Sequence, residues 1–490
     1  MTTNANEGRA THGGADWSSR KLHFIGIGGA GMSGLALVCH QLGATVSGSD
    51  RSDSSYMERL RAAGLEPAVG HAAANLPEAA EVVVSTAIGD DNPELALARE
   101  RGTELIHRGA LLAALCAEKR LIAIAGTHGK TTTTAMVVWA LRALGADPAF
   151  FVGGEVPGVG EAGSDANAGW GEGEWVVAEA DESDASLLEL RPEIAVVTNV
   201  ELDHHSRWGS VGQLRAAFRR FLEPVAAAVL PADGSLDDLA PAVAAVEGFD
   251  AARPGPVELD LAVPGAHNRA NARAALAAVG FAVPLPAGSD AIDPASAEQA
   301  RSSAAGALAS FPGVRRRLEL KGRRDAVRVY DDYAHHPTEV RAALAALREL
   351  GDQHLVAVFQ PHLYSRTKAL AEEFGAALAL ADEVAVRDVY PAREEPVGEL
   401  AGVSGLQVAA AVADRIGGRP VWWLPDAATA PAALTTLLDR NAANGIGEQV
   451  LVTLGAGDVF RLGEALVDGD PTVPHWPRRE ERNRAMEGER

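Results

Sequence analysis

Short apolar runs recur along most of this chain, and glycines or polar residues follow each run at once. Leu121–Ala125, Trp175–Ala178 and Ile194–Thr198 are typical of them. Uninterrupted apolar runs of this length fit strands that are buried on both faces, and helical patterns separate them. The pattern therefore predicts an α/β protein built from successive strand–helix units around parallel sheets.

The same pattern divides the chain into three successive domains. A length of 490 residues agrees with about three domains. We expect domains over 21–117, 118–312 and 313–468, with a disordered tail over 1–20 and a charged tail over 469–490. The passage 230–263 is rich in Pro, Ala, Asp and Gly and has weak periodicity. Phe311-Pro312-Gly313 marks a junction, and three arginines follow it at Arg315–Arg317.

A candidate phosphate loop lies in the stretch Arg120–Gly145. A buried strand runs into the turn Gly126–Gly129, and Lys130-Thr131 opens a helix. In such a loop backbone N–H groups face phosphates, Lys130 reaches the β/γ-phosphates and the Thr131 hydroxyl binds Mg2+. Ile124 stands where the full motif has its first glycine, so an ordinary strand-to-helix turn is the alternative.

Another glycine loop, Gly26–Gly31, comes earlier in the chain and is called the first glycine loop; it follows the strand His23–Ile25 and matches G-x-G-x-x-G. The next strand ends near Asp50, where an acidic residue can meet a ribose hydroxyl. This motif fits NAD, and it fits any other diphosphate nucleotide equally well. Ser85, Thr86 and Arg108 follow further strands at the same edge, although a turn and a surface arginine explain them as well.

Acidic residues and histidines follow two strands of the expected central domain. The run Glu179–Asp184 comes directly after Trp175–Ala178 and predicts an Mg2+ site, with a solvated acidic surface as the alternative. His204-His205 suggests zinc, but adjacent histidines point in different directions. We therefore expect only one of them to lie beside the nucleotide. His335 and Arg366 each follow a later strand. We therefore expect them at the edge of the sheet where ligands bind, beyond the carboxyl ends of the strands.

Composition and charge narrow the class of protein. Lys+Arg 44 against Asp+Glu 66 gives a net charge of −22, which disfavours general binding to nucleic acid or to anionic membranes. Cys39 and Cys116 are too few for a disulfide framework. The first residues contain no apolar run, and the longest uncharged apolar passage, 274–288, is too short for a membrane span. We expect a soluble, cytoplasmic protein of unpredicted oligomeric state.

Six motifs in order resemble the Mur ligase family over about residues 21–465. They are HFIGIGGAGMSGLA, GTHGKTTTTAM, AEADESDASLL, TNVELDHH, DDYAHHPTEV and FQPHLYSRT. The resemblance implies three α/β domains: N-terminal Rossmann-like and UDP-binding, central P-loop ATPase-like, and C-terminal Rossmann-like for the amino acid. The first two motifs resemble the branch of the family that adds L-alanine.

The resemblance implies an ATP-dependent ligase that works in the synthesis of peptidoglycan precursors. It would join L-alanine to the lactyl carboxylate of UDP-N-acetylmuramate through an acyl phosphate, with ATP and Mg2+ as cofactors. The first glycine loop would then hold the UDP diphosphate and not NAD. Three alternatives stay open: a recycling ligase that adds a tripeptide, an NAD-dependent oxidoreductase, and a nucleotide-binding module without activity.

The resemblance also assigns roles to residues. The catalytic set is Lys130, Glu179, His204, Arg317 and His335, and the metal ligands are Thr131, Glu179 and His204. The ATP-binding set is Gly126, Thr127, His128, Gly129, Lys130, Thr131, Thr132, His267, Asn268 and Asn271. The UDP-sugar-binding set is Gly28, Gly29, Ala30, Gly31, Met32, Asp50, Ser85, Thr86 and Arg108. The amino-acid-binding set is Tyr333, His335 and Arg366.

Three features depart from the family pattern. Leu363 stands where many relatives carry a second arginine, which affects the binding of the alanine carboxylate. Phe218 stands where several sibling ligases carbamylate a lysine, so a carbamate metal ligand is not expected. The passage 230–263 is shorter than is usual in the family, so central-domain strands are expected to be missing there.

Overall fold

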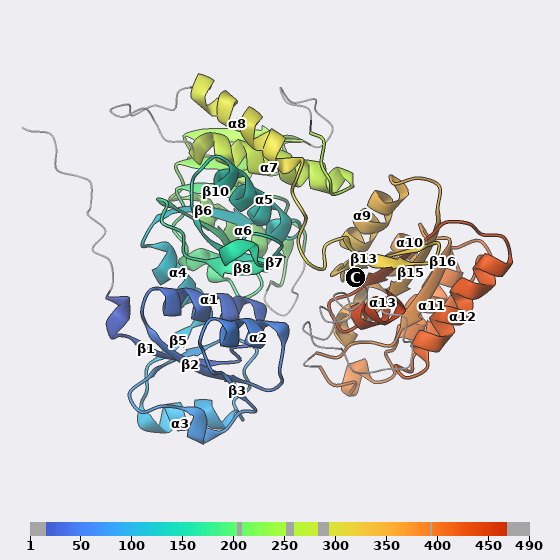
Figure 1. Ribbon diagram of the computed structural model, residues 1–490, viewed down its shortest axis with the longest axis horizontal. Coiled ribbons are helices and arrows are strands. Elements are labelled where there is room, and N and C mark those ends of the chain that lie inside the picture. The colour runs from blue at the N-terminus through green and yellow to red at the C-terminus, as the bar shows by residue number, and fades with distance from the viewer. Residues whose placement is uncertain (1–15, 203–207, 251–258, 283–293, 393, 468–490) are drawn as a thin grey trace, which may run out of the picture. The chain divides into compact units, whose positions relative to one another are not determined.

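The computed structural model describes residues 16–202, 208–250, 259–282, 294–392 and 394–467. The chain forms two compact units. The first runs through Ala262 and resumes over Asn268–Val314, and the second comprises Val263–His267 and the chain from Arg315 onward. The described residues form three sheets, two in the first unit and one in the second (Figure 1). This confirms the predicted three-part α/β fold.

The N-terminal sheet has the strand order β3-β2-β1-β4-β5, and its paired strands run parallel. Its strands are β1 (Lys21–Ile25), β2 (Thr45–Asp50), β3 (Ala68–Val69), β4 (Glu81–Val84) and β5 (Leu105–His107). Its helices are α1 (Ala30–Gln41), α2 (Ser55–Ala62), α3 (Pro93–Arg101) and α4 (Arg108–Cys116). The strand order reverses between β1 and β4, which is where doubly wound sheets bind ligands. The glycine loop after β1 lies at this point.

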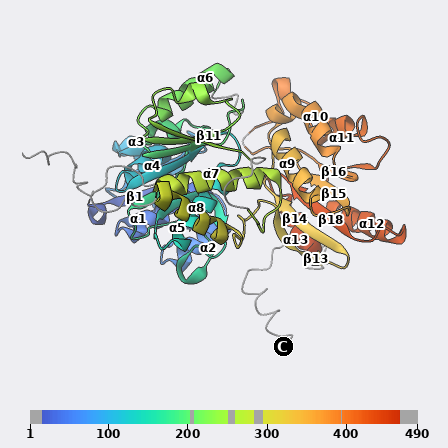
Figure 2. The same cartoon turned by 90° about the horizontal axis from the view of Figure 1, so that it is seen from above.

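The central sheet has the order β12-β11-β10-β6-β9-β7-β8. Its strands are β6 (Arg120–Ala125), β7 (Ala149–Val156), β8 (Ala166–Gly169), β9 (Trp175–Glu179), β10 (Ile194–Val197), β11 (Ala227–Pro231) and β12 (Ala245–Phe249). Its helices are α5 (Lys130–Ala143), α6 (Val211–Leu222), α7 (Ala266–Ala282) and α8 (Pro294–Leu308). Because β9 and β10 flank β6, the loops that follow these three strands meet at one edge. Figure 2 shows α8 beside α5, where Trp139 Nε1 donates to the Ala307 carbonyl at 3.0 Å.

The second unit contains a sheet of order β13-β14-β18-β15-β16-β17. Its strands are β13 (Glu319–Arg324), β14 (Val327–Asp332), β15 (His354–Phe359), β16 (Glu383–Arg387), β17 (Val421–Leu424) and β18 (Gln449–Leu454). Its helices are α9 (Pro337–Arg348), α10 (Tyr364–Leu378), α11 (Gly405–Ala413), α12 (Ala430–Ala443) and α13 (Phe460–Val467). Residues of α9, α10 and α11 pack in one core on one face, and residues of α12 and α13 pack in another core on the opposite face.

Several local features differ from the sequence expectation. The tail is not disordered up to residue 20, because Trp17 is buried and its Nε1 donates to Glu118 at 3.2 Å. The strand β12 lies in the passage whose periodicity is weak, and β8 and β13 each pair antiparallel with their neighbours. Phe218 on α6 is fully buried, as a core side chain would be. No helix in the described ranges is long and apolar enough to cross a membrane.

A buried polar network ties α3 to the N-terminal sheet. The carboxylate of Glu94 is fully buried and accepts the Ser49 hydroxyl at 2.6 Å and the Asn75 amide at 2.8 Å. His23 Nε2 lies 3.2 Å from it, and the Ala72 amide donates at 3.0 Å. Burial alone would raise the pKa of Glu94, but these hydrogen bonds outweigh burial and lower it to about 2.

This network predicts a stability that depends on pH. Because the folded pKa of Glu94 lies below its unfolded value, its contribution of about 3 kcal/mol is present above pH ~4.5 and is lost as pH falls towards 2. We expect Glu94→Gln to lower the free energy of unfolding by a few kcal/mol at pH 7. In urea titrations the difference from wild type should shrink below pH 4.5. Glu100→Gln, on the exposed face of the same helix, is the matched control; equal losses in both variants would contradict the assignment.

Candidate active site

The loop between β6 and α5 has a backbone that only glycine accommodates at two positions. Gly126 and Gly129 have φ of +125° and +84°. A Cβ atom on Gly126 would lie 2.1 Å from the Thr198 hydroxyl, and one on Gly129 would lie 2.6 Å from Oδ1 of Asn271. The neighbouring loop after β10 also holds this turn, because Asn199 accepts the His128 amide at 2.9 Å and donates to the His128 carbonyl at 2.9 Å. The turn is therefore fixed before any ligand binds.

Among the α-helices of the first unit whose N-caps the structure describes, α1 and α5 begin without a side-chain cap, and both follow a glycine loop. α5 begins after Gly129 and α1 begins after Gly29. The other N-terminal-sheet helices α2, α3 and α4, and the central helix α6, each have a side chain that accepts a first-turn amide. First-turn amides without a cap favour anions. At both loops the first-turn amides are therefore left to a ligand or to water, although α10, α11 and α12 of the second unit also begin without a side-chain cap.

Lys130 lies at the start of α5 and is held by three acceptors. Its Nζ donates to the carbonyls of Gly126 at 2.7 Å and Thr127 at 3.2 Å, and to Glu182 Oε2 at 2.8 Å. An ammonium group has three N–H donors, so all three are in use. Burial alone would lower the pKa of Lys130, but the carboxylates of Glu182 and its neighbours raise it, and Lys130 stays protonated. A phosphate that bound to Lys130 would therefore replace one of these acceptors.

Thr131 and Glu179 form the part of the site that could hold a cation. The Thr131 hydroxyl lies 2.9 Å from Glu179 Oε2, and the Gly153 amide donates to the same oxygen at 2.9 Å. Two neighbouring ligands of an octahedral Mg2+, each about 2.1 Å from the ion, lie about 3 Å apart. A hydroxyl and a carboxylate oxygen at this separation fit Mg2+. Thr132, next in the helix, is buried.

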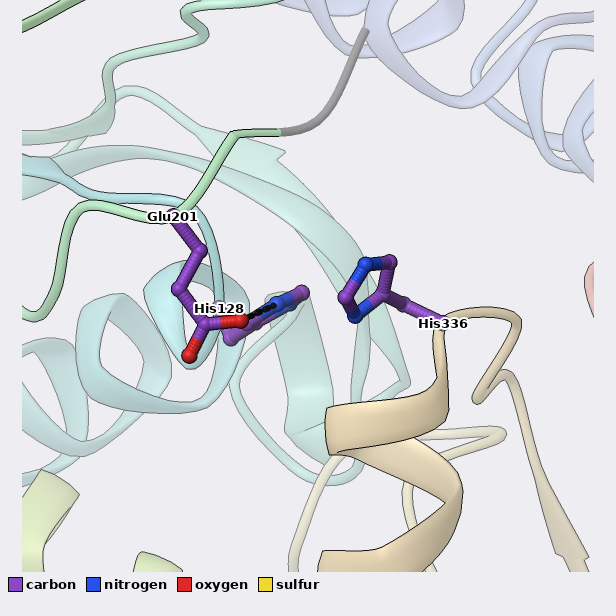
Figure 3. Close-up of side chains that lie close together, drawn as sticks. All are labelled: His128, Glu201 and His336. Carbon is purple, nitrogen blue, oxygen red and sulfur yellow. Dashed lines mark ion pairs between the residues drawn. The ribbon is translucent and has the colours of Figure 1, made fainter. Parts of the chain in front are cut away.

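Thr127 and His128 contact the segment that follows β10. The Thr127 hydroxyl lies 3.0 Å from the Glu201 carbonyl and 2.9 Å from its amide. His128 Nε2 and Glu201 Oε2 form an ion pair at 3.4 Å, drawn as a dashed line in Figure 3. His336, also drawn there, belongs to the second unit, where it caps α9. His204 and His205 lie outside the described residues, so the role predicted for His204 stays a prediction.

The residues predicted for the nucleoside end divide between the two units. Asn268 and Asn271 are both buried on α7 in the first unit. Asn271 Nδ2 lies 3.5 Å from Asn268 Oδ1, and its own Oδ1 approaches Gly129 of the phosphate loop. These two side chains therefore lie beside the loop. His267 belongs to the second unit.

The predicted UDP-sugar residues gather around the first glycine loop. Asp50 Oδ2, at the end of β2, accepts the Gly28 amide at 3.0 Å. Gly29, Ala30 and Gly31 open α1, and Met32 is buried beneath them. Ser85 is half-buried and Thr86 exposed in the turn after β4. The amide of Asn167, on β8 of the central sheet, donates to the Ala30 carbonyl at 2.7 Å, so the central domain supports this loop.

Arg108 has an arrangement that the sequence did not reveal. Its Nη2 lies 2.8 Å from Asp181 Oδ2 and 2.7 Å from Asp184 Oδ2, and its Nε donates to Asp184 Oδ2 at 2.9 Å. Its Nη1 lies 3.2 Å from the point where a Cβ on Gly31 would be. The acidic loop is the run Glu179–Asp184 at the end of β9. One guanidinium group thus contacts this acidic loop and borders the first glycine loop.

The second unit brings its predicted residues together at the ends of β14 and β15. Tyr333 and His335 make an edge contact at 5.4 Å between ring centroids, and His335 and His362 make another at 5.9 Å. Arg366 is buried, and its Nη1 lies 3.5 Å from His362 Nδ1. The cluster of Tyr333, His335, His362 and Arg366 therefore combines a guanidinium cation with aromatic side chains.

Asp332 supports the turn that carries Arg317. This buried carboxylate accepts the amides of Leu318 at 2.8 Å and Ala334 at 2.7 Å. Burial raises its pKa to about 6, although Arg317 opposes that shift. Arg317 lies over the Tyr333 ring at 5.3 Å and 4.0 Å from Glu339. The other two arginines of the predicted cluster pair with carboxylates, Arg315 with Glu319 and Arg316 with Asp331.

Three α/β sheets with an uncapped Gly-Lys-Thr loop beside an acidic loop are typical of enzymes that use a nucleoside triphosphate. The comparisons with known proteins refine that class. The model of the "Mur ligase family, catalytic domain" matches residues 21–120, the "Mur ligase middle domain" matches 124–254, and the "Mur ligase, glutamate ligase domain" matches 316–457. The chain belongs to the Mur ligase family.

Similar proteins agree with this membership. A UDP-N-acetylmuramate–L-alanine ligase from Renibacterium salmoninarum is 44% identical over 484 residues, which cover 91% of this chain and 95% of the relative. The crystal structure of a UDP-N-acetylmuramate-alanine ligase from Thermotoga maritima is similar with a TM-score of 0.74 and 29% identity, covering 92% of this chain and 98% of that one. A murein peptide ligase from Psychrobacter arcticus shares the fold, with a TM-score of 0.64, 22% identity, and coverage of 93% and 100%.

Proposed function

We propose that this chain joins L-alanine to the lactyl carboxylate of UDP-N-acetylmuramate, with cleavage of ATP to ADP and phosphate. The relatives named for this reaction are up to 44% identical over most of the chain. The observation that carries the chemistry is the fixed phosphate loop, in which Lys130 and the Thr131–Glu179 oxygen pair lie side by side. The product is an amide suited to the synthesis of peptidoglycan precursors.

The first step transfers a phosphoryl group. A lactyl carboxylate oxygen attacks the γ-phosphorus of ATP, and the bond between that phosphorus and the β,γ-bridging oxygen breaks. The products are ADP and an acyl phosphate of the UDP-sugar. Two anions must approach each other, so positive charge around them lowers the barrier. Lys130 would lie against the β/γ-phosphates, and the uncapped α5 amides would bind their oxygens. Arg317 would add a further cation near the transferred group.

Thr131 and Glu179 would hold Mg2+, with His204 as a further candidate ligand. When bound, this ion neutralises phosphate charge. Glu179 is oriented by the Gly153 amide and the Thr131 hydroxyl, so its oxygen is in position without rearrangement of the loop. Asn268 and Asn271 would contact the nucleoside side of ATP, together with His267.

The second step forms the amide bond. The neutral amine of L-alanine attacks the acyl carbon, the bond between that carbon and the phosphate oxygen breaks, and the nitrogen gives up one proton to the departing phosphate. Arg366 would bind the alanine carboxylate, because a guanidinium group pairs well with this anion. Tyr333 and His335 would border the small methyl group and the amine. Leu363 carries no charge, so Arg366 would bind the alanine carboxylate without a second arginine at position 363.

A phosphate-release assay tests this function directly. Purified protein with ATP, Mg2+ and UDP-N-acetylmuramate should release phosphate when L-alanine is added, and much less when a murein tripeptide replaces L-alanine; glycine and L-serine in parallel measure how strictly the site selects its amino acid. Omission of the UDP-sugar is the control for uncoupled ATP hydrolysis. Release that depends on the tripeptide and not on L-alanine would favour a recycling ligase, and no L-alanine-dependent release would overturn the proposal.

A further inference from the structure

Arg108 connects the two phosphate-binding loops of the first unit. It is the first residue of α4, directly after β5, at the same sheet edge as the first glycine loop. Its guanidinium borders Gly31 on one side and binds Asp181 and Asp184 on the other. The side chain of Asp184 is 3% exposed, so this contact is shielded from solvent and its charges are weakly screened.

The acidic loop that Arg108 holds also controls Lys130. Asp181, Glu182 and Asp184 follow one another within a few residues after β9, and Glu182 is the only side chain among the described acceptors of the Lys130 ammonium. Because Glu182 belongs to this loop, a shift of the loop changes the distance between its carboxylate and the Lys130 ammonium.

We propose that Arg108 is a positioning residue that couples UDP-sugar binding to ATP binding, in addition to any contact it makes with the sugar nucleotide. A diphosphate at the first glycine loop adds negative charge beside Gly31 and draws the guanidinium away from Asp181 and Asp184. Arg108 then no longer holds the acidic loop in place. The phosphates of ATP replace Glu182 as an acceptor of the Lys130 ammonium. This inference rests on the proposed function, since it takes the diphosphate ligand from there.

Linkage makes the coupling measurable in both directions. Isothermal titration gives the Kd of a non-hydrolysable ATP analogue with Mg2+, with and without saturating UDP-N-acetylmuramate. In the wild-type protein we expect the UDP-sugar to tighten binding of the analogue by roughly fivefold or more. The reverse titration should give the same ratio.

Two variants remove the coupling from opposite ends. Arg108→Met removes the cation, and Asp184→Asn keeps the shape of the side chain but removes a charge that does not border the glycine loop. Both should bring the ratio below about twofold, while Arg108→Lys, which can contact one carboxylate at a time, should keep part of it. Arg99→Met and Asp90→Asn remove the partners of an exposed ion pair on the same domain and should leave the ratio unchanged.

The outcomes separate coupling from a plain ligand contact. If Arg108 only binds the UDP-sugar, Arg108→Met weakens that binding, Asp184→Asn has no effect, and the ratio stays at its wild-type value; that result overturns the inference. A ratio of one in the wild-type protein, with both ligands bound, also overturns it. Absence of any binding of UDP-N-acetylmuramate would instead count against the proposed function. Thermal melts identify a variant that fails to fold, and then the other variant decides.

Discussion

Lys130→Ala should abolish ligation while binding of the UDP-sugar persists. Lys130 is the cation of the phosphate loop, and its ammonium lies between the loop carbonyls and Glu182, where phosphate oxygens would replace the carboxylate. Removal of a fixed charge that acts on the transferred phosphoryl group costs roughly 10³-fold or more in kcat/KM. The first glycine loop belongs to a different sheet, so the Kd for UDP-N-acetylmuramate alone should change by less than about threefold.

The control for this prediction is Lys21→Ala, which removes an exposed lysine at the start of β1. Activity is measured as L-alanine-dependent phosphate release, and binding of the UDP-sugar is measured by calorimetry. Lys130→Arg should rescue little, because a planar guanidinium does not fit the three acceptors around one ammonium. If Lys130→Ala lost activity and UDP-sugar binding to the same extent, Lys130 would also serve UDP-sugar binding. That result would contradict the separate roles assigned to the two loops.

Glu179→Gln is the second variant with a large expected effect. The amide keeps the volume of the side chain but removes the charge from the oxygen that lies beside the Thr131 hydroxyl. If this pair holds Mg2+, kcat/KM should fall roughly 10²-fold, and the Mg2+ concentration for half-maximal activity should rise. The measurement is a titration of Mg2+ at fixed ATP and UDP-sugar.

The matched control is Glu174→Gln, an exposed glutamate just before the same strand. It should leave both the rate and the Mg2+ requirement at their wild-type values. A Glu179→Gln protein that is slow but keeps an unchanged Mg2+ requirement would show that Glu179 serves the site without binding the ion. In that case the cation site would have to be sought elsewhere among the acidic residues.

The sequence predicted those parts of the fold that local signals define. The turn between β6 and α5 lies where the sequence predicted it, because two glycines bracket a turn between an apolar run and a helical pattern. The antiparallel strands β8 and β13 were not predicted, and β12 was missed because Ala245–Phe249 contains a glycine and a glutamate that break the apolar run. Such strands form because they pair with neighbouring strands in the folded sheet, and no short window of sequence reveals that pairing.

In the candidate site, too, the features with a local sequence signal were predicted and those that depend on long-range packing were not. Gly126, Lys130, Thr131 and Glu179 are close in space because their strands are neighbours, and strand ends are visible in the sequence. The pairing of Arg108 with Asp181 and Asp184 joins residues 73 and 76 positions apart, and it depends on how two sheets pack within the first unit. The contact of Asn167 with Ala30 spans 137 positions and had no local signal at all. Glu182 lay in the acidic run, but nothing in that run singled it out as the partner of Lys130.

The central claim is that the carboxylate of UDP-N-acetylmuramate is activated by phosphorylation before L-alanine attacks it. Substrate labelled with ¹⁸O in both oxygens of the lactyl carboxylate tests this most directly, with mass spectrometry of the released phosphate. One labelled oxygen should appear in the phosphate for each amide formed, and the other should remain in the amide carbonyl. Phosphate without the label, formed alongside the amide, would contradict the account.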